Sequence, residues 1–323
     1  MNLRSPGALA RLAVAAGLTA YILWISDPRA TMQALGAADW RWVAAAVGLV
    51  FVDRALMAYR WLVLLRPIAP GTGLTLPRVL RVFFVSTFVG TFLPSIGGDA
   101  VRAIGLARHG ISMADSVASV LVDRVFGTVS ILLVGAGAVW FAPASMPGWL
   151  APATVALTVL TAGLVALGLF NDSAERLVAG LLQRFTRGKL HKAATNLLRS
   201  LRRYNHSEGA LLNVLGGSIA VQLLRVSQAW LLGRALGIDA GFTTYLIFIP
   251  VILLVLLLPI TITGIGTSQA AFVWLFADVG VAAADAFALS VLFLALGIVG
   301  NLPGGILYAT GGMHGRPAPE APV

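Results

Sequence analysis

Charged side chains lie within apolar segments of this chain, and their types point to phosphate chemistry. Arginine outnumbers aspartate among them: the set is Arg54, Arg60, Arg102, Arg124 and Arg225, with Asp53, Asp99 and Asp123. Ionisable groups at membrane depth are costly, so they pair with one another or face a wet cavity. A guanidinium group suits phosphate because its planar fork donates two parallel hydrogen bonds. The excess of arginine therefore predicts that an anionic group binds in such a cavity.

A structural alternative is that each aspartate neutralises an arginine and the pairs only hold helices together. For Arg60 a further alternative is that its long side chain extends to the inner membrane surface. Asp53 and Arg60 are seven residues apart and share a helix face, whereas Arg54 falls on another. We therefore expect only one of Asp53 and Arg54 to line a shared cavity.

Two similar polar breaks interrupt apolar runs, one at 94–102 and one at 259–269. Each begins with proline, which removes a backbone donor, and continues with glycines, which loosen a helix. Broken helices in a membrane must be buried by protein or line a wet cavity, and matched breaks in two halves are typical of transporter sites. The residues that we expect to bind substrate are Gly97, Gly98, Asp99, Arg102, Asp123, Arg124, Thr261, Thr263, Gly264, Gly266, Ser268, Gln269, Arg225 and Arg54.

The elements that position these residues follow from hydropathy. The 323 residues are 58% hydrophobic and 11% charged, which predicts an all-α polytopic membrane protein. We expect about six full spans, at roughly 8–26, 42–65, 115–141, 150–170, 210–234 and 284–310. Two shorter apolar segments, 80–95 and 243–259, lead into the breaks and are followed by short helices at 99–111 and 266–277. We expect each pair to be a re-entrant hairpin that enters and leaves by the same membrane face.

Basic connectors predict the orientation. Connector 171–207 is strongly basic and amphipathic at helical spacing, so it should be cytoplasmic, either in the membrane interface or packed as a cap on the bundle. Both termini then lie in the cytoplasm, and two halves repeat with inverted topology. We expect one transmembrane domain over 1–311, with halves of about 1–141 and 150–311 joined through 142–149, and a disordered tail at 312–323.

Several function classes receive no support from the composition. Cysteine is absent, and the four histidines lie far apart in polar connectors, so no metal or other cofactor is expected. The net charge of +10 fits the positive-inside rule and anionic lipid partners rather than nucleic acid. No G-x-S-x-G, P-loop or H-E-x-x-H motif occurs, which disfavours an enzyme.

One stretch resembles a known family. Leu93-Pro94, Gly97-Gly98-Asp99, Arg102, Arg108-His109-Gly110 and Ser119–Gly127 are similar to motifs of the lysylphosphatidylglycerol synthase transmembrane region, a flippase-like (UPF0104-like) family. The block from Pro259 to Ala271 is similar to the family's late motif, although Ser268-Gln269 stands where many members have Arg-Glu. By position, the resemblance implies a site made of Asp99, Arg102, Asp123, Arg124, Gly264, Gly266 and Gln269.

The resemblance and the residues together predict a lipid translocase of the inner membrane. Arg102 and Arg124 would bind phosphate, Asp99 and Asp123 would orient them, and polar residues of the second break would add neutral hydrogen bonds. The substrate would be an anionic phospholipid or a polyprenyl-phosphate-linked lipid. The alternatives are a non-transporting partner of a lipid or glycan biosynthesis enzyme, a lipid-headgroup enzyme, and a small-anion transporter. Lipid aminoacylation is not expected, because the aminoacyl-transferase domain of the synthases is absent.

Overall fold

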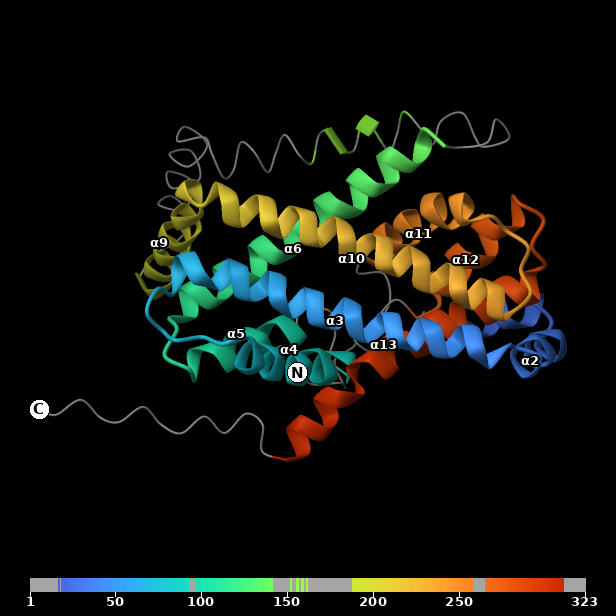
Figure 1. Cartoon of the computed structure of the whole chain (residues 1–323), viewed down its shortest axis with the longest axis horizontal. Helices are drawn as coiled ribbons and strands as arrows, with labels where there is room; N and C mark the ends of the chain where they lie inside the picture. The colour runs from blue at the N-terminus through green and yellow to red at the C-terminus, as the bar shows by residue number, and fades with distance from the viewer. Residues whose placement is uncertain are drawn as a thin grey trace, which may run out of the picture. The chain divides into compact units, whose positions relative to one another are not determined.

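The computed structural model of this chain is helical in the part of the chain that it describes. The described residues are 17, 19–92, 97–141, 152, 155, 156, 158, 159, 161, 188–257 and 265–310. The helices in chain order (Figure 1) are α2 (Pro28–Gly36), α3 (Trp40–Ile68), α4 (Leu76–Phe92), α5 (Gly97–Ala107), α6 (Met113–Val139), α9 (Gly188–Arg202), the 3-10 turn η1 (Arg203–His206), α10 (Glu208–Ala235), α11 (Phe242–Leu257), α12 (Thr267–Ala277) and α13 (Ala283–Ala309). The predicted all-α class is confirmed for these residues.

Four of the described helices, α3, α6, α10 and α13, are long and apolar enough to cross a membrane. They contain 27 to 29 residues each. At about 1.5 Å per residue they are roughly 40 Å long, which exceeds the ~30 Å hydrocarbon core. They coincide with the predicted spans 42–65, 115–141, 210–234 and 284–310, whereas about half of 8–26 and most of 150–170 lie outside the described residues.

The first broken segment forms a helical hairpin from α4 and α5. A Cβ added to Gly98 would lie 3.1 Å from Gly90 Cα, and one added to Gly105 would lie 2.7 Å from a Val82 methyl. Later residues of α5 therefore meet earlier residues of α4, so the two helices are antiparallel. With 11 residues, α5 is too short to cross a bilayer. The helices agree with the predicted segments 80–95 and 99–111.

The second broken segment places α11 against α12. The Phe276 ring lies 5.2 Å from the Tyr245 ring and 5.3 Å from the Phe248 ring, centroid to centroid. The end of α12 thus packs on the beginning of α11, which again indicates an antiparallel pair. The two helices match the predicted segments 243–259 and 266–277, and the connecting residues 258–264 lie outside the described part of the chain.

By its internal packing the chain divides into two compact units, which are discontinuous in sequence. Unit 1 comprises Met1–Arg54, Leu133–Gly148 and Val221–Leu302. Unit 2 comprises Ala55–Leu132, Trp149–Ala220 and Pro303–Val323. Unit 2 holds the α4–α5 hairpin and unit 1 holds the α11–α12 hairpin. The predicted division into sequence halves and an inverted repeat remains a prediction.

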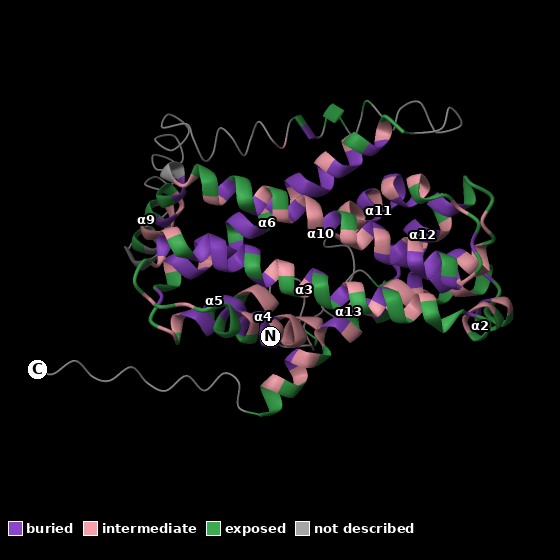
Figure 2. Ribbon diagram, viewed as in Figure 1, coloured by how far each residue is buried: buried purple, intermediate pink, exposed green. Residues whose placement is uncertain are grey.

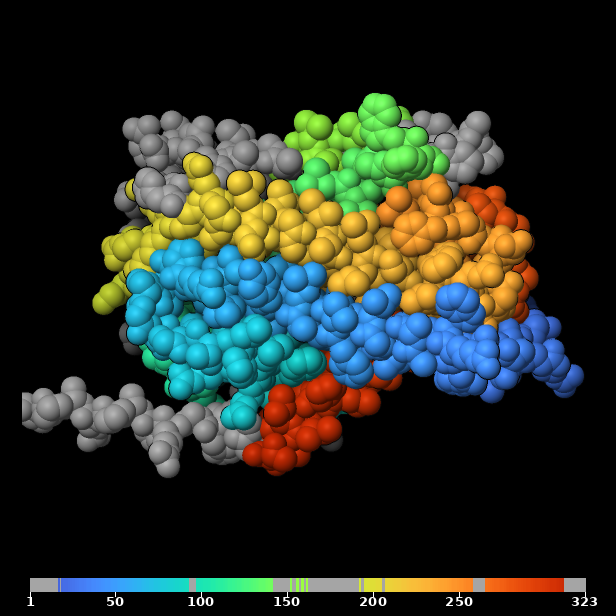
Figure 3. Space-filling model, viewed as in Figure 1, coloured from blue at the N-terminus to red at the C-terminus, as the bar shows by residue number. Residues whose placement is uncertain are grey.

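Helices α3 and α10 lie side by side (Figure 3). In unit 1 the rings of Trp42 and Trp230 are 6.2 Å apart in an edge-to-face arrangement. In unit 2 Asn213 Nδ2 donates to Tyr59 Oη at 3.5 Å. The C-terminal part of α3 is largely buried (Figure 2) and joins the apolar core of unit 2 with residues such as Trp61.

The turn η1 anchors the α9 segment to the end of α3. Tyr204 is fully buried, and its Oη donates to the carbonyl oxygen of Leu64 at 2.8 Å. Arg203 Nη1 donates to the carbonyl oxygen of Ile68, also at 2.8 Å. Burial, with a smaller contribution from the nearby Asp115 carboxylate, raises the pKa of Tyr204 above its ordinary value. The phenol therefore remains a neutral donor at physiological pH.

Candidate functional site

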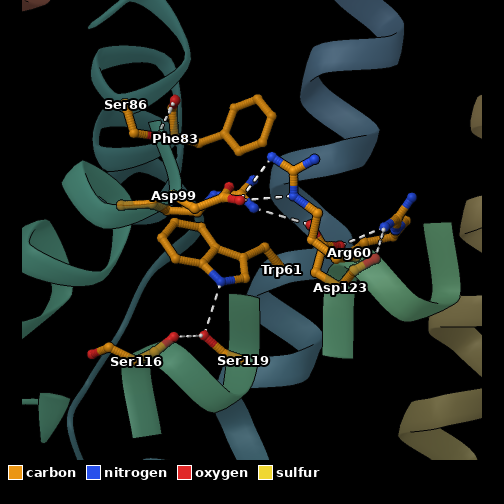
Figure 4. A network of polar contacts seen from close by, with 10 residues as sticks. Arg60, Trp61, Phe83, Ser86, Asp99, Ser116, Ser119 and Asp123 are labelled. Carbon is orange, nitrogen blue, oxygen red and sulfur yellow. Dashed lines mark hydrogen bonds and ion pairs between the residues drawn. The ribbon is translucent and has the colours of Figure 1, made fainter. Parts of the chain in front are cut away.

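Asp123 lies at the centre of a buried ionic cluster in unit 2 (Figure 4). From α5, Arg102 Nη1 donates to Asp123 Oδ2 at 3.0 Å. From α3, Arg60 Nη2 donates to the other carboxylate oxygen, Oδ1. All three side chains are buried. The α4–α5 hairpin thus delivers one arginine and α3 the other to a single aspartate on α6.

Aromatic rings enclose the Arg102 guanidinium. Its Cζ lies 4.4 Å from the centroid of the Trp61 ring and 4.7 Å from that of Phe83. Trp61 is itself held by a hydrogen bond from its Nε1 to Ser119 Oγ at 3.2 Å, visible in Figure 4. Ring faces attract a cation that has lost its water, so these residues compensate part of the cost of burying Arg102.

A glycine on α10 makes room for the second arginine of the cluster. A Cβ added to Gly217 would lie 2.8 Å from Cγ and 3.2 Å from Cδ of Arg60. The aliphatic stem of Arg60 therefore packs directly on the α10 backbone, and its head turns to Asp123. The alternative in which Arg60 extends to the membrane surface is wrong, because this side chain is buried within unit 2.

Next to this cluster, Asp99 and Arg124 form an ion pair that is open to the outside of the protein. Asp99 Oδ2 accepts from Arg124 Nε at 2.8 Å and lies 2.7 Å from Nη2. The side chain of Arg124 is 50% exposed and that of Asp99 is 24% exposed. Both residues also act electrostatically on Arg102. The five groups contain three arginines and two aspartates, so their formal charge is +1.

The start of α5 positions Asp99. The helix begins at Gly97, and Asp99 falls in its first turn, where a carboxylate is favoured by the helix dipole. Gly98 touches the α4 backbone, with an added Cβ only 3.3 Å from the carbonyl oxygen of Ser86. Gly98 therefore allows this helix end to pack against α4, which brings Asp99 within reach of Arg124 on α6, and the predicted residue Gly97 is the first residue of α5.

Unit 1 holds a second intramembrane cluster, around Asp53 on α3. Arg54 Nη1 donates to Asp53 Oδ2 at 2.8 Å, and Arg225 Nε on α10 lies 3.6 Å from Oδ1. Arg54 Nε also donates to Asn301 Oδ1 on α13 at 3.1 Å. The Arg54 side chain turns back to its neighbour, and the expectation that only one of Asp53 and Arg54 lines a shared cavity remains a prediction.

The second break contributes fewer described side chains. Gly266 has a positive φ of 88°, and its backbone N–H donates to Gln269 Oε1 at 2.7 Å. The Gln269 side chain therefore caps the N-terminal end of α12. Ser268 and Gln269 are both buried. The remaining predicted residues of this break, Thr261, Thr263 and Gly264, lie outside the described residues.

The structure thus gathers the predicted charged residues into two groups. Asp99, Arg102, Asp123 and Arg124 meet in unit 2, and Arg54 and Arg225 meet in unit 1. The sequence-based site omitted the residues that complete these groups: Asp53, Arg60, Trp61, Phe83, Ser119, Gly217 and Asn301. The helix face that Arg60 shares with Asp53 was a sequence signal that Arg60 faces other charged residues. No sequence pattern indicated that Trp61 and Phe83 enclose Arg102. Among the described residues, no group of three or more His, Asp or Glu could hold a metal ion.

Comparisons with known proteins cover nearly all of the chain. A family model described as the lysylphosphatidylglycerol synthase TM region matches residues 8–304. A UPF0104 membrane protein of Methanothermobacter thermautotrophicus is 24% identical over 302 residues, which cover 86% of this chain and 87% of that protein. The range matched by the family model includes both ionic clusters and both hairpins.

Proposed function

Because the chain belongs to the family of the lysylphosphatidylglycerol synthase transmembrane region, we propose that it moves a lipid between leaflets. The family and its apolar helices make it a multi-pass membrane protein. Within this proposal the lipid is an anionic phospholipid or a polyprenyl-phosphate-linked lipid, and the membrane is the inner membrane with both termini cytoplasmic. The match is to the transmembrane region of the synthase, so the proposal involves no aminoacyl transfer.

The observation that carries the proposal is the exposed ion pair of Asp99 and Arg124. Arg124 lies on a candidate membrane span, yet its side chain is 50% exposed. A charged head at such a position needs water or an anionic partner, because hydrocarbon solvates it poorly. Asp99 Oδ2 contacts Arg124 at Nε and Nη2, and because the guanidinium group is half exposed, a lipid phosphate could exchange with this carboxylate. The formal charge of +1 on the surrounding groups favours that anion.

The two predicted phosphate ligands then have different roles. Arg124 is accessible and would contact the phosphate directly. Arg102 is buried between Trp61 and Phe83 and bonded to Asp123, so it would hold the hairpin and add positive potential. It would meet the phosphate only if α5 moved away from α6. Arg54 and Arg225 would offer the lipid a second cationic position in unit 1.

The experiment is leaflet exchange by the purified full chain in proteoliposomes. Fluorescent phosphatidylglycerol, phosphatidylethanolamine or a polyprenyl phosphate is incorporated, and an impermeant quencher reports the fraction that reaches the outer leaflet. We expect the wild-type protein to exchange an anionic lipid between leaflets. We expect Arg124→Gln to lower the rate of this exchange at least tenfold. The matched control is Arg234→Gln, since Arg234 is 45% exposed and also pairs with an aspartate, Asp239, at 3.8 Å.

The control should exchange lipid at the wild-type rate. Wild-type exchange by the folded Arg124→Gln protein would refute the assignment of Arg124. Absence of exchange for every lipid by folded wild-type protein would refute autonomous translocation and favour the non-transporting partner of a lipid or glycan enzyme. Conversion of a labelled lipid to a new product would favour the lipid-headgroup enzyme.

A further inference from the structure

A cavity of about 600 Å³ lies between the beginning of α6 and the C-terminal half of α9, wholly within unit 2. Figure 1 shows α9 beside this end of α6. The lining combines apolar and charged side chains, among them Met113, Val117, Leu197, Asp115, Arg199 and Arg203. Asp115 and Arg124 are nine residues apart on α6, or about 14 Å along the helix. The cavity is therefore separate from the exposed pair of Asp99 and Arg124.

Asp115 lines this cavity and carries a carboxylate oxygen without a hydrogen bond from the described residues. Its backbone N–H donates to Ser112 Oγ at 3.0 Å, and Ser112 Oγ donates to Asp115 Oδ2 at 2.7 Å, which caps α6. The other carboxylate oxygen, Oδ1, is buried and accepts no hydrogen bond within the described part of the chain. Its cationic neighbour is Arg203, whose Nη1 is 3.5 Å away. If Arg203 shifted from Oδ1 toward a phosphate, this oxygen would be uncovered, and a ligand N–H or O–H donor next to that phosphate would satisfy it.

Two arginines supply donors to the same cavity. Arg199 is exposed, and Arg203 is only partly covered although one of its nitrogens donates to the carbonyl oxygen of Ile68. Together with Asp115 they leave a formal charge of +1 at the cavity. Arginine forks bind phosphate through paired, charge-assisted hydrogen bonds. The cavity therefore combines a phosphate-binding pair with an acceptor for a neighbouring donor.

The position of the cavity indicates where its ligand comes from. Candidate spans α6 and α10 begin at Met113 and Glu208, so the cavity lies near the level where spans leave the hydrocarbon. Basic side chains close to a membrane attract anionic headgroups. Apolar walls at Met113, Val117 and Leu197 suit the glycerol backbone and first acyl carbons of a lipid, and they would bind a free phosphate ion poorly.

We propose that this cavity binds the headgroup of a phospholipid that carries a hydrogen-bond donor next to its phosphate, as phosphatidylglycerol and phosphatidylethanolamine do. Arg199 and Arg203 hold the phosphate, Asp115 Oδ1 accepts from the headgroup hydroxyl or ammonium, and the apolar wall contacts the start of the chains. This binding does not depend on translocation, because none of the three residues belongs to the Asp99–Arg124 pair.

The test is a calorimetric titration of the purified full chain in detergent with short-chain lipids. Phosphatidylethanolamine and phosphatidylcholine are a matched pair, because they share a phosphate and a net charge while only the first has N–H donors. Phosphatidylglycerol is the third lipid, and glycerol 3-phosphate tests a free phosphate ester. Each titration is repeated in the Arg124→Gln background, so that binding at the exposed pair is removed and the two sites are distinguished.

We expect phosphatidylethanolamine and phosphatidylglycerol to bind at least tenfold more tightly than phosphatidylcholine or glycerol 3-phosphate, in both backgrounds. Arg199→Gln should weaken binding about tenfold, the size of one charge-assisted hydrogen bond. Arg202→Gln is the control, because Arg202 is an exposed neighbour that does not line the cavity. Asp115→Asn should reduce the preference for phosphatidylethanolamine over phosphatidylcholine several-fold.

A cavity-filling variant, Val117→Trp, tests the location without removing charge. It should abolish binding while its circular dichroism and melting temperature remain close to those of the wild type. Wild-type affinity in the folded Val117→Trp protein would overturn the proposal. Equal affinity for phosphatidylethanolamine and phosphatidylcholine, or glycerol 3-phosphate binding as tightly as the lipids, would also overturn it. If Val117→Trp fails to fold, the affinities of Arg199→Gln and Arg202→Gln test the location instead. Equal affinities in these two variants would overturn the proposal.

Discussion

Neighbouring residues of α6, Asp123 and Arg124, belong to ion pairs of opposite character. Asp123 is buried, and each of its carboxylate oxygens accepts a hydrogen bond from a different arginine, Arg60 on α3 and Arg102 on α5. Arg124 is half exposed, and its guanidinium group bonds to Asp99. Successive helical residues are about 100° apart, so one faces the protein interior and the other does not. The same residue types thus serve packing in one place and remain accessible to a ligand in the other.

The difference in burial determines what each pair contributes to stability. A buried ion pair contributes little net stability, but removing one member leaves an uncompensated charge and costs about 3–5 kcal/mol. An exposed pair contributes about 0–1 kcal/mol because water and salt screen it. The Asp53 cluster lies between these cases, because Asp53 is buried while Arg225 is 23% exposed and 3.6 Å away. Stability measurements can therefore separate the structural arginines from the accessible ones.

The largest effect is expected for Asp123→Ala. The substitution removes the carboxylate that bridges the buried Arg60 and Arg102, so we expect the free energy of unfolding to fall by about 3–5 kcal/mol. Thermal unfolding in one detergent, followed by circular dichroism, measures the change. Asp239→Ala is the control, since Asp239 is fully exposed, and it should melt like the wild type. An unchanged melting temperature for Asp123→Ala would contradict the structural role assigned to the buried ion pairs.

A smaller loss is expected for Gly98→Ala. The new methyl would lie 3.1 Å from Gly90 Cα, so α5 must move away from α4 at a cost of about 1–3 kcal/mol. Gly127→Ala on α6 is the matched control, because nothing lies within 4 Å of its added Cβ. Melting temperatures should fall for the first variant and stay level or rise for the second. Equal melting temperatures would mean that the close approach at Gly98 does not position Asp99.

The sequence predicted the helices better than it predicted the roles of the charges. Hydropathy located the four long helices, and the proline and glycine breaks located both hairpins, because length and backbone chemistry are local properties. Whether an arginine is buried depends on residues far away in sequence. Arg102 is enclosed by Trp61 and Phe83, and Arg60 fits because Gly217 lacks a side chain. Nothing in the spacing of the arginines distinguishes Arg102 from Arg124.

A loss of about 1 kcal/mol is expected for Tyr204→Phe at neutral pH, because the hydrogen bond to Leu64 disappears. The raised pKa of Tyr204 adds a pH dependence with a defined sign. The folded phenol keeps its proton above pH 10, the ordinary value, whereas the unfolded one loses it. The Tyr204 contribution is therefore complete below pH 10 and is lost as the pH rises above it. Melting curves of wild type and Tyr204→Phe at pH 7 to 11 should converge, and a constant difference would contradict this assignment.

The smallest change in stability, and the sharpest test of the comparison, is expected for Asp99→Asn. The exposed pair contributes about 0–1 kcal/mol, so both Asp99→Asn and Arg124→Gln should melt close to the wild type. If the pair served packing alone, losing either partner would have similar effects on lipid exchange. If Arg124 binds phosphate, Asp99 competes with that phosphate for the guanidinium group. Asp99→Asn should then keep or increase the exchange of anionic lipid in proteoliposomes, while Arg124→Gln loses it. Equal losses in the two variants would assign the exposed pair to structure, as at Asp123, because only a ligand site distinguishes the cation from its partner.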